Sequence, residues 1–206
     1  MLFSSLLFLF LFLPIVLLIY RILRNEFRNV FLLLVSLFFY AWGEGELVLI
    51  MIASIFFNYV IGNVISYFET KKGFKKLALT LGVVLNLSML IYYKYINFIF
   101  DNVNSVFSNL NLQIDDITLP IGISFFTFQS LSYLIDVYRK TVPSQKKIFD
   151  LGLYISLFPQ LIAGPIVRCE DIHKEITVNN ELFKEGVLKF IRGLSKKVVS
   201  HKLCKF

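Results

Sequence analysis

The chain has 206 residues, of which 57% are hydrophobic and only 17% are charged, and 23 of them are phenylalanine. A soluble domain of this length does not carry so much apolar surface, so the composition indicates a protein whose solvent is lipid. The net charge of +7 does not call for nucleic acid, because the placement of the basic residues between apolar segments accounts for it. The two cysteines lack metal-ligand spacing and indicate neither a disulfide framework nor a zinc site.

Long apolar segments predict helices that cross a membrane. Four of them approach or exceed the roughly 20 residues that span a hydrocarbon core of about 30 Å. They are residues 2–20, 47–68, 77–100 and 119–138. A fifth segment, 30–42, is shorter and would cross only with tilt, local thinning of the bilayer or residues borrowed from its flanks. The first segment has no basic residues before it and no small-residue cleavage site, so we expect an uncleaved span.

Basic residues fill alternate connections between these segments. They are Arg21, Arg24 and Arg28, then Lys71, Lys72, Lys75 and Lys76, and finally Arg139, Lys140, Lys146 and Lys147. The intervening connections, 43–46 and 101–118, contain acidic residues but no lysine or arginine. Because basic loops stay on the cytoplasmic side, this alternation predicts a multi-pass protein of the cell membrane with its amino terminus outside.

The pattern changes at residues 148–163, an apolar segment that contains Pro159 and Gln160 and is followed by a basic tail. A plain crossing would place that tail outside, against the charge rule, whereas a re-entrant segment would keep it in the cytoplasm. We favour the re-entrant segment, which implies a covered cavity near 158–168 because irregular backbone at membrane depth needs such cover. Within the tail, residues 183–198 predict a basic amphipathic helix, which lies either in the membrane interface or on the protein's own cytosolic surface.

Few polar groups in the apolar segments point to chemistry. Lys94 stands among tyrosines near the end of its segment and is explained by a stem that snorkels to the interface, with a cation lining a cavity as the alternative. Asp136 precedes Arg139 by one turn, as in an ion pair at a membrane edge. His173 and His201 lie in the hydrophilic tail without a recognisable nucleophile and carboxylate, so we assign no catalytic residue and no metal site.

Two motifs carry a family resemblance. The run LPIGISFFTFQSLSYLIDVYR at 119–139 is followed by LFPQLIAGPIVR at 157–168. Both resemble the membrane-bound O-acyltransferases of the alginate O-acetyltransferase type, as does the opening of the chain, and the likeness extends to about residue 198. The resemblance implies an all-α, funnel-shaped membrane bundle that moves acetyl groups from a cytosolic donor, such as acetyl-CoA, to hydroxyls of an exported, alginate-like polysaccharide. Extracytoplasmic acetylation proteins would be its partners, besides the lipid bilayer.

The resemblance also implies which residues line the funnel. They are Gln129 and Asp136 in the first motif, and Gln160, Gly164, Pro165 and Arg168 in the second. None of these is catalytic, because the family's catalytic histidine belongs to a segment beyond residue 198, where the likeness stops. We therefore expect residues 1–206 to form a single membrane domain, the N-terminal portion of such an enzyme, left by a frameshift or a premature stop. Acetyl transfer by the purified chain alone would contradict this expectation.

Two other classes of function compete with an acyltransferase fragment. The first is a noncatalytic scaffold for modification of an envelope polymer, which would recruit partners through residues 101–118. The second is a transporter component, for which Lys94 and the broken segments would be the evidence. No repeated pair of broken helices supports the transporter, so we rank it last. Co-purification of a partner without acyl transfer would favour the scaffold, and solute flux in liposomes would favour the transporter.

Overall fold

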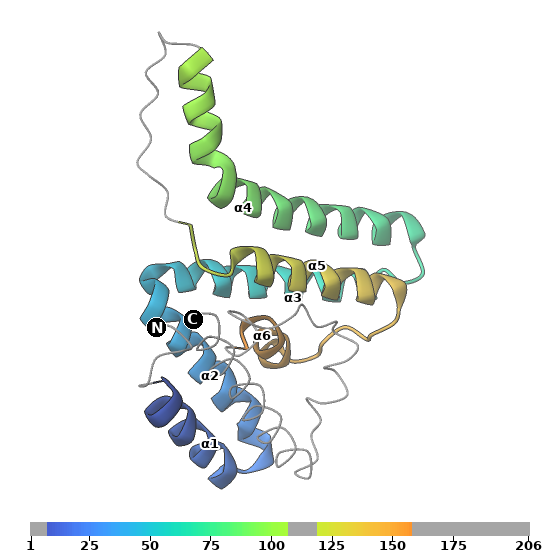
Figure 1. Ribbon diagram of the computed structural model, residues 1–206. Helices are drawn as coiled ribbons and strands as arrows, with labels where there is room; N and C mark the ends of the chain where they lie inside the picture. The colour runs from blue at the N-terminus through green and yellow to red at the C-terminus, as the bar shows by residue number, and fades with distance from the viewer. Residues whose placement is uncertain (1–7, 107–118, 158–206) are drawn as a thin grey trace, which may run out of the picture. The chain divides into compact units, whose positions relative to one another are not determined.

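The computed structural model describes residues 8–106 and 119–157, and within these ranges the chain is helical and forms no strand (Figure 1). In chain order the elements are η1 (Phe8–Phe12), α1 (Leu13–Ile22), α2 (Asn25–Glu44), η2 (Gly45–Leu47), α3 (Val48–Tyr67), α4 (Lys72–Val106), α5 (Ile123–Arg139) and α6 (Ile148–Ser156). The chain divides into two compact units, 1–172 and 173–206, and every described residue belongs to the first. The prediction of an all-α fold is confirmed for the described residues, whereas the amphipathic helix predicted at 183–198 lies outside them.

Each predicted apolar segment contains a helix, although the bounds differ. Helix α2 has 20 residues where the apolar run suggested about 13, because its first turns include polar residues such as Asn25 and Asn29. Helix α4 continues to Val106, six residues into the connection predicted at 101–118. At the turn between α2 and α3, Gly45 has a positive φ of +61°, which glycine adopts at little cost because it has no Cβ atom.

By length and composition, two helical stretches of the described chain are able to cross a membrane. They are Phe27–Tyr67, which runs through α2, η2 and α3, and Lys72–Phe100 in α4. Only 33% and 28% of their most apolar windows are buried inside the protein. Large apolar side chains on these helices, among them Phe38, Phe56 and Leu81, are instead exposed. Such a surface fits a lipid environment, so the chain has the character of a membrane protein.

Helices α3, α4 and α5 pack against one another, and α6 packs against α2, α3 and α5. In Figure 1, α3, α5 and the first half of α4 run alongside one another, whereas α6 is seen nearly end-on. Buried side chains on α3 recur every three or four residues. They are Met51, Ser54, Ile55, Asn58, Ile61, Gly62 and Ile65. This spacing places one face of α3 toward its neighbours and leaves the opposite face exposed.

Two glycines allow α5 to approach its neighbours closely. A Cβ atom added to Gly62 of α3 would lie 2.6 Å from the hydroxyl oxygen of Tyr133 on α5. A Cβ atom added to Gly82 of α4 would lie 2.7 Å from Cδ1 of Leu134 and 3.0 Å from Cγ2 of Ile61. Small residues at such positions let helix backbones come together in membrane proteins. Leu134 therefore marks a level at which α3, α4 and α5 meet.

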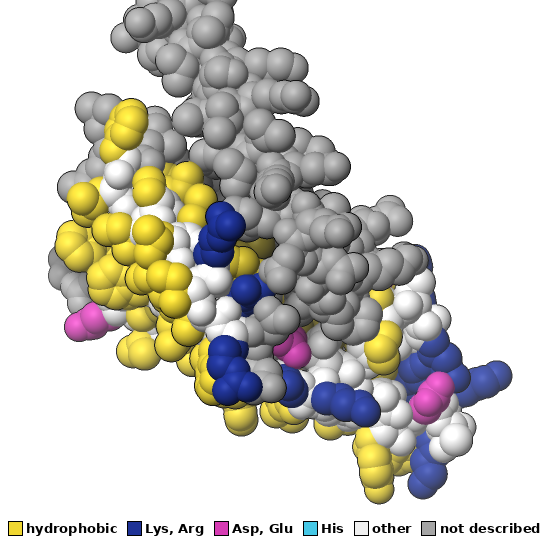
Figure 2. Space-filling model, turned by 90° about the horizontal axis from the view of Figure 1, so that it is seen from below, with side chains coloured by type: hydrophobic (Ala, Val, Ile, Leu, Met, Phe, Trp, Pro, Cys, Tyr) yellow, Lys and Arg dark blue, Asp and Glu magenta, His cyan; other side chains and the backbone are white. Residues whose placement is uncertain are grey.

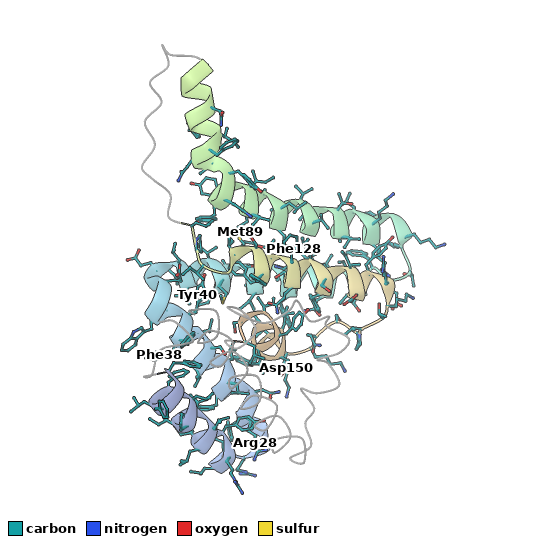
Figure 3. All side chains as sticks on the ribbon, viewed as in Figure 1. Arg28, Phe38, Tyr40, Met89, Phe128 and Asp150 are labelled. Carbon is teal, nitrogen blue, oxygen red and sulfur yellow. The ribbon has the colours of Figure 1, made fainter. Side chains whose placement is uncertain are left out.

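Helix α4 bends partway along its length, and Met89 lies close to the bend (Figures 1 and 3). One residue earlier, the hydroxyl of Ser88 donates to the carbonyl of Leu85 at 2.9 Å, a local bond that often bends membrane helices. Beyond the bend, Lys94 is exposed and its Nζ lies 5.6 Å from the centre of the Tyr95 ring. Lys94 thus lies beside a tyrosine ring, and its snorkelling to an interface stays a prediction.

The two ends of the packed helices carry different charge. At one end Lys75 Nζ lies 4.9 Å from the Tyr138 ring centre, and Lys140 forms an ion pair with Glu69. The hydrogen bond and charge of Lys140 lower the pKa of Glu69 below its usual value. Figure 2, which views the molecule from below, shows lysine and arginine side chains from the centre of the view to its right, with hydrophobic side chains concentrated at its left. The two basic connections 68–71 and 140–147 thus begin at the same end of the helices.

At the other end, α2 contacts the chain just before α5. The Ile121 N–H donates to Glu44 Oε2 at 3.0 Å, and the Tyr40 hydroxyl donates to the Ile121 carbonyl at 3.0 Å. Figure 3 shows Tyr40 directed from α2 toward this region. Ile121 lies outside a helix, so its backbone N–H and carbonyl have no helical partners. These two bonds satisfy both groups.

We expect Gly62→Ala to destabilise the protein by about 1–3 kcal/mol, because the new methyl group would displace the Tyr133 ring from a packed position. Gly73→Ala is the matched control, since nothing lies within 4 Å of a Cβ at Gly73 and alanine favours the helix. Thermal unfolding of both purified variants in detergent measures the difference. Equal melting temperatures would show that α3 and α5 do not approach as described.

Candidate functional site within the helical bundle

A pair of buried asparagines joins α3 to α4. Asn58 Nδ2 donates to Asn86 Oδ1 at 3.2 Å, and Asn86 Nδ2 donates to Asn58 Oδ1 at 2.8 Å. The remaining amide hydrogens bind the carbonyls of Ser54 and Gly82, each at 2.8 Å. Both side chains are almost fully buried. The two amides therefore satisfy each other in surroundings that otherwise offer few polar partners.

Asn58 and Asn86 are not among the residues predicted from the sequence. A usable signal was present: Ser54 and Asn58, and likewise Gly82 and Asn86, are spaced four residues apart within apolar runs. Residues four apart share one face of a helix, so each asparagine lies on a face with a small residue. Such a face is typical of contacts between membrane helices.

Helix α5 carries three further polar side chains that are buried. Thr127 and Ser130 are 0% exposed and Gln129 is 2% exposed. Thr127 Oγ1, Ser130 Oγ and Gln129 Oε1 have no hydrogen-bond partner among the residues that the structure describes. Because unpaired buried polar atoms are costly, these positions are candidates for contact with a ligand, water or another part of the chain.

Gln129 shares one edge of α5 with a second polar group. Gln129, Ser132 and Asp136 are spaced three and four residues apart, so they form a stripe along the helix. The Ser132 hydroxyl lies 3.5 Å from Asp136 Oδ2 and donates to it. The stripe runs from the buried middle of α5 toward its basic end at Arg139.

The connection that follows α5, residues 140–147, runs back alongside α3 and α5. The Gln145 N–H donates to the Tyr133 hydroxyl at 3.2 Å, and the Tyr59 hydroxyl donates to the Lys146 carbonyl at 2.9 Å. Tyr59 lies eight residues before the end of α3 at Tyr67, which corresponds to about 12 Å along the helix. The connection 140–147 therefore runs back along α3 rather than away from it.

This return leads into α6, a helix of nine residues in which Leu151, Gly152, Leu153, Tyr154, Ile155 and Ser156 are all buried. A Cβ atom at Gly152 would lie 3.2 Å from Leu33 of α2 and 3.6 Å from Ile55 of α3. At the start of α6, Asp150 Oδ1 accepts a hydrogen bond from Asn29 of α2 at 3.2 Å, and Figure 3 shows Asp150 beside that helix. The helix ends at Ser156, three residues before Pro159.

The structure places two of the six predicted funnel residues. Gln129 and Asp136 lie on the same edge of α5, two turns apart, as their spacing predicts. Gln160, Gly164, Pro165 and Arg168 lie outside the described residues, as do both histidines. The lining of a funnel stays a prediction. Within the described ranges, the polar groups at the site are hydroxyls, amides and a carboxylate, which are able to form hydrogen bonds, and no imidazole base is among them.

Over nearly its whole length the chain is similar to part of the O-acetyltransferases of the alginate O-acetylase type. Over 96% of its length it is 41% identical to the probable alginate O-acetylase AlgI of Pseudomonas aeruginosa and 40% identical to that of Azotobacter vinelandii. It is also 32% identical, over 97% of its length, to a peptidoglycan O-acetyltransferase of Helicobacter pylori. These findings confirm the family resemblance predicted from the sequence.

The chain spans only part of these relatives. It covers 39% of the Pseudomonas aeruginosa protein, 41% of the Azotobacter vinelandii protein and 44% of the Helicobacter pylori protein. No family model matches the chain, and no solved structure matches it.

We expect replacement of one member of the asparagine pair, as in Asn58→Leu, to destabilise the protein by about 1–3 kcal/mol, because Asn86 would keep a buried amide without its partner. The double replacement Asn58→Leu with Asn86→Leu should cost less than the sum of the two single changes, since it leaves neither amide unpaired. Thermal unfolding of the four proteins in detergent measures the coupling. Strict additivity would argue against the reciprocal bonds.

Proposed function

We propose that this chain forms part of a membrane-bound O-acyltransferase that transfers acetyl groups to hydroxyls of an exported glycan. The observation that carries the proposal is the 41% identity to an alginate O-acetylase along 96% of the chain. The relative named as a peptidoglycan O-acetyltransferase supports a glycan acceptor without fixing which polymer it is. Acetyl-CoA or a similar thioester is the proposed donor.

The chemistry divides into positioning and proton transfer. The acceptor hydroxyl attacks the acetyl carbonyl, the new ester C–O bond forms, the thioester C–S bond breaks, and a base takes the hydroxyl proton. The described residues suit positioning, because Gln129 and Asp136 lie on one stripe of α5 that starts in the bundle and ends near basic residues. We propose that Gln160, Gly164, Pro165 and Arg168 continue this lining. The base would come from residues outside this set.

The proposed topology has about five crossings, a re-entrant segment and an amino terminus outside. Three observations support it. The connections 68–71 and 140–147 begin at one end of the helices, beside lysines. The α2–α3 turn lies at the other end, where Glu44 contacts Ile121. The chain then runs back along α3 into the short, buried helix α6, as a re-entrant segment would. The outer end would face extracytoplasmic acetylation proteins and the acceptor.

A chimera tests the proposed activity. Fusing this chain to the remaining part of the Pseudomonas aeruginosa relative should restore acetyl esters to the polymer in cells that lack the relative, because the chain would replace the equivalent wall of the funnel. Ester content of the purified polymer is the measurement, and the relative's remaining part alone is the control. A chimera that reaches the membrane at normal level but yields no ester would contradict the proposal.

Within the same chimera, Gln129→Leu should lower ester content by roughly tenfold or more if the buried amide positions a substrate. Phe128→Leu is the matched control, since Phe128 is the next residue but is 44% exposed and lies outside the stripe. Similar losses from both variants, at equal amounts of protein, would remove Gln129 from the proposed lining.

Cysteine labelling tests the topology. In a variant with Cys169→Ser and Cys204→Ser, a membrane-impermeant maleimide should label Glu46→Cys in intact cells and Lys71→Cys only after lysis. The physical reason is that both positions are exposed but lie at opposite ends of α3. The reverse pattern would place the amino terminus inside, and equal labelling of both positions would mean that α3 does not cross.

A further inference from the structure

The feature of the bundle that the proposed function leaves unexplained is a pair of hydroxyl groups on α5. Thr127 and Ser130 are both 0% exposed, and neither Thr127 Oγ1 nor Ser130 Oγ has a hydrogen-bond partner among the residues described. A hydroxyl that is buried without a partner is unfavourable, so two of them on one helix call for a physical explanation.

The position of these hydroxyls follows from their spacing to Leu134. Residues 127, 130 and 134 lie three and four apart and share one face of α5. Leu134 Cδ1 and Ile61 Cγ2 both lie within about 3 Å of the Cβ position at Gly82, so this face points to the seam between α3 and α4. Thr127 and Ser130 therefore face the same seam, one to two turns farther along α5.

The asparagine pair lies at that same level. Helix α5 runs parallel to α3, as the contacts of Tyr133 with Gly62 and of Lys140 with Glu69 require, and antiparallel to α4. Leu134 lies at the level of Ile61 on α3 and of Gly82 on α4. Ser130 lies about one turn earlier on α5. At that level the corresponding residues are Asn58 on α3 and Asn86 on α4. Three helices thus contribute buried polar groups to one layer: Ser54, Asn58, Asn86, Thr127 and Ser130.

In this layer, the hydrogen-bonding groups that remain unpaired on α5 complement those that remain on the asparagine pair. The amide hydrogens of both asparagines are already bound to each other's oxygen and to the carbonyls of Ser54 and Gly82. Each amide oxygen accepts one of these bonds and has a second lone pair. The hydroxyls on α5 supply donors and acceptors. A small guest that both donates and accepts would connect the two sets.

We infer that ordered water occupies the seam between α3, α4 and α5 and bridges Thr127 and Ser130 to the amide pair. Buried water usually makes about three hydrogen bonds to otherwise unpaired polar groups, which this layer provides. The five side chains of the layer carry no charge, so the site favours a neutral guest over a metal ion. The bridge fixes the register of α5, because a shift by one turn would place Leu134 against the amides.

Removal of a hydroxyl distinguishes a hydrated layer from a dry one, because it lowers the melting temperature in the first case and leaves it unchanged or raises it in the second. Thr127→Val keeps the side-chain shape. It should lower the melting temperature of the purified 206-residue chain by roughly 2–6 °C if water is bound there. Thr127→Ser, which keeps the hydroxyl, should lose less. Thr80→Val on α4 is the control, since Thr80 is exposed and its hydroxyl already donates to the Lys76 carbonyl at 3.0 Å. A melting temperature for Thr127→Val that is unchanged or raised would overturn the inference.

A lower melting temperature of Thr127→Val would also result if the Thr127 hydroxyl bonds to a carbonyl of its own helix. A double-mutant cycle distinguishes this explanation from bound water. If water joins Thr127 to the amide pair, Thr127→Val and Asn86→Leu will lower the melting temperature together by less than the sum of their separate effects. Additive effects would overturn the inference even if Thr127→Val alone destabilises. Should Asn86→Leu fail to fold, Asn86→Ser serves in the cycle, because it also removes the amide oxygen but is smaller.

Discussion

An apolar solvent offers no hydrogen bonds, so the backbone of this chain must satisfy its own polar groups, and the helical structure follows from that constraint. Its effect is clearest where helices break. There, side chains on neighbouring helices bind the exposed backbone: Glu44 and Tyr40 bind Ile121, Tyr59 binds Lys146, and Tyr133 binds Gln145. Three of these four side chains are tyrosines, whose rings pack against apolar surroundings while the hydroxyl reaches a polar partner. The irregular connections are therefore held in place by the helices beside them.

Close packing around α5 is the second determinant of the site. Gly62 and Gly82 remove the side chains that would keep α5 away from α3 and α4, so that Tyr133 and Leu134 lie against helix backbone. This approach buries the adjacent polar side chains of α5 and brings them to the level of the asparagine pair. Packing and polarity are thus linked: the contact that stabilises the bundle also creates its layer of buried hydrogen-bonding groups.

The return of the chain into α6 connects this bundle to function. A helix of nine residues is about 13 Å long, too short to cross a hydrocarbon core of about 30 Å. It is buried against α2 and α3, as the proposed re-entrant segment would be. Relatives of this chain are named as enzymes that acetylate alginate or peptidoglycan. In the function proposed for this chain, the polar stripe on α5 would form part of a wall that orients a donor and a hydroxyl acceptor.

The sequence by itself determined the membrane character, the helical segments and the resemblance to O-acetyltransferases, because apolar content, segment length and the motifs at 119–139 and 157–168 are local properties. The seven-residue spacing of Gln129 and Asp136, which the resemblance named, places them on one edge of α5, because spacing fixes which residues of a helix lie together. Only the tertiary structure paired Asn58 with Asn86, brought Gly62 against Tyr133 and returned residues 140–147 along α3. Those contacts join residues 28 to 87 positions apart, and helical periodicity carries no information about which faces of different helices meet.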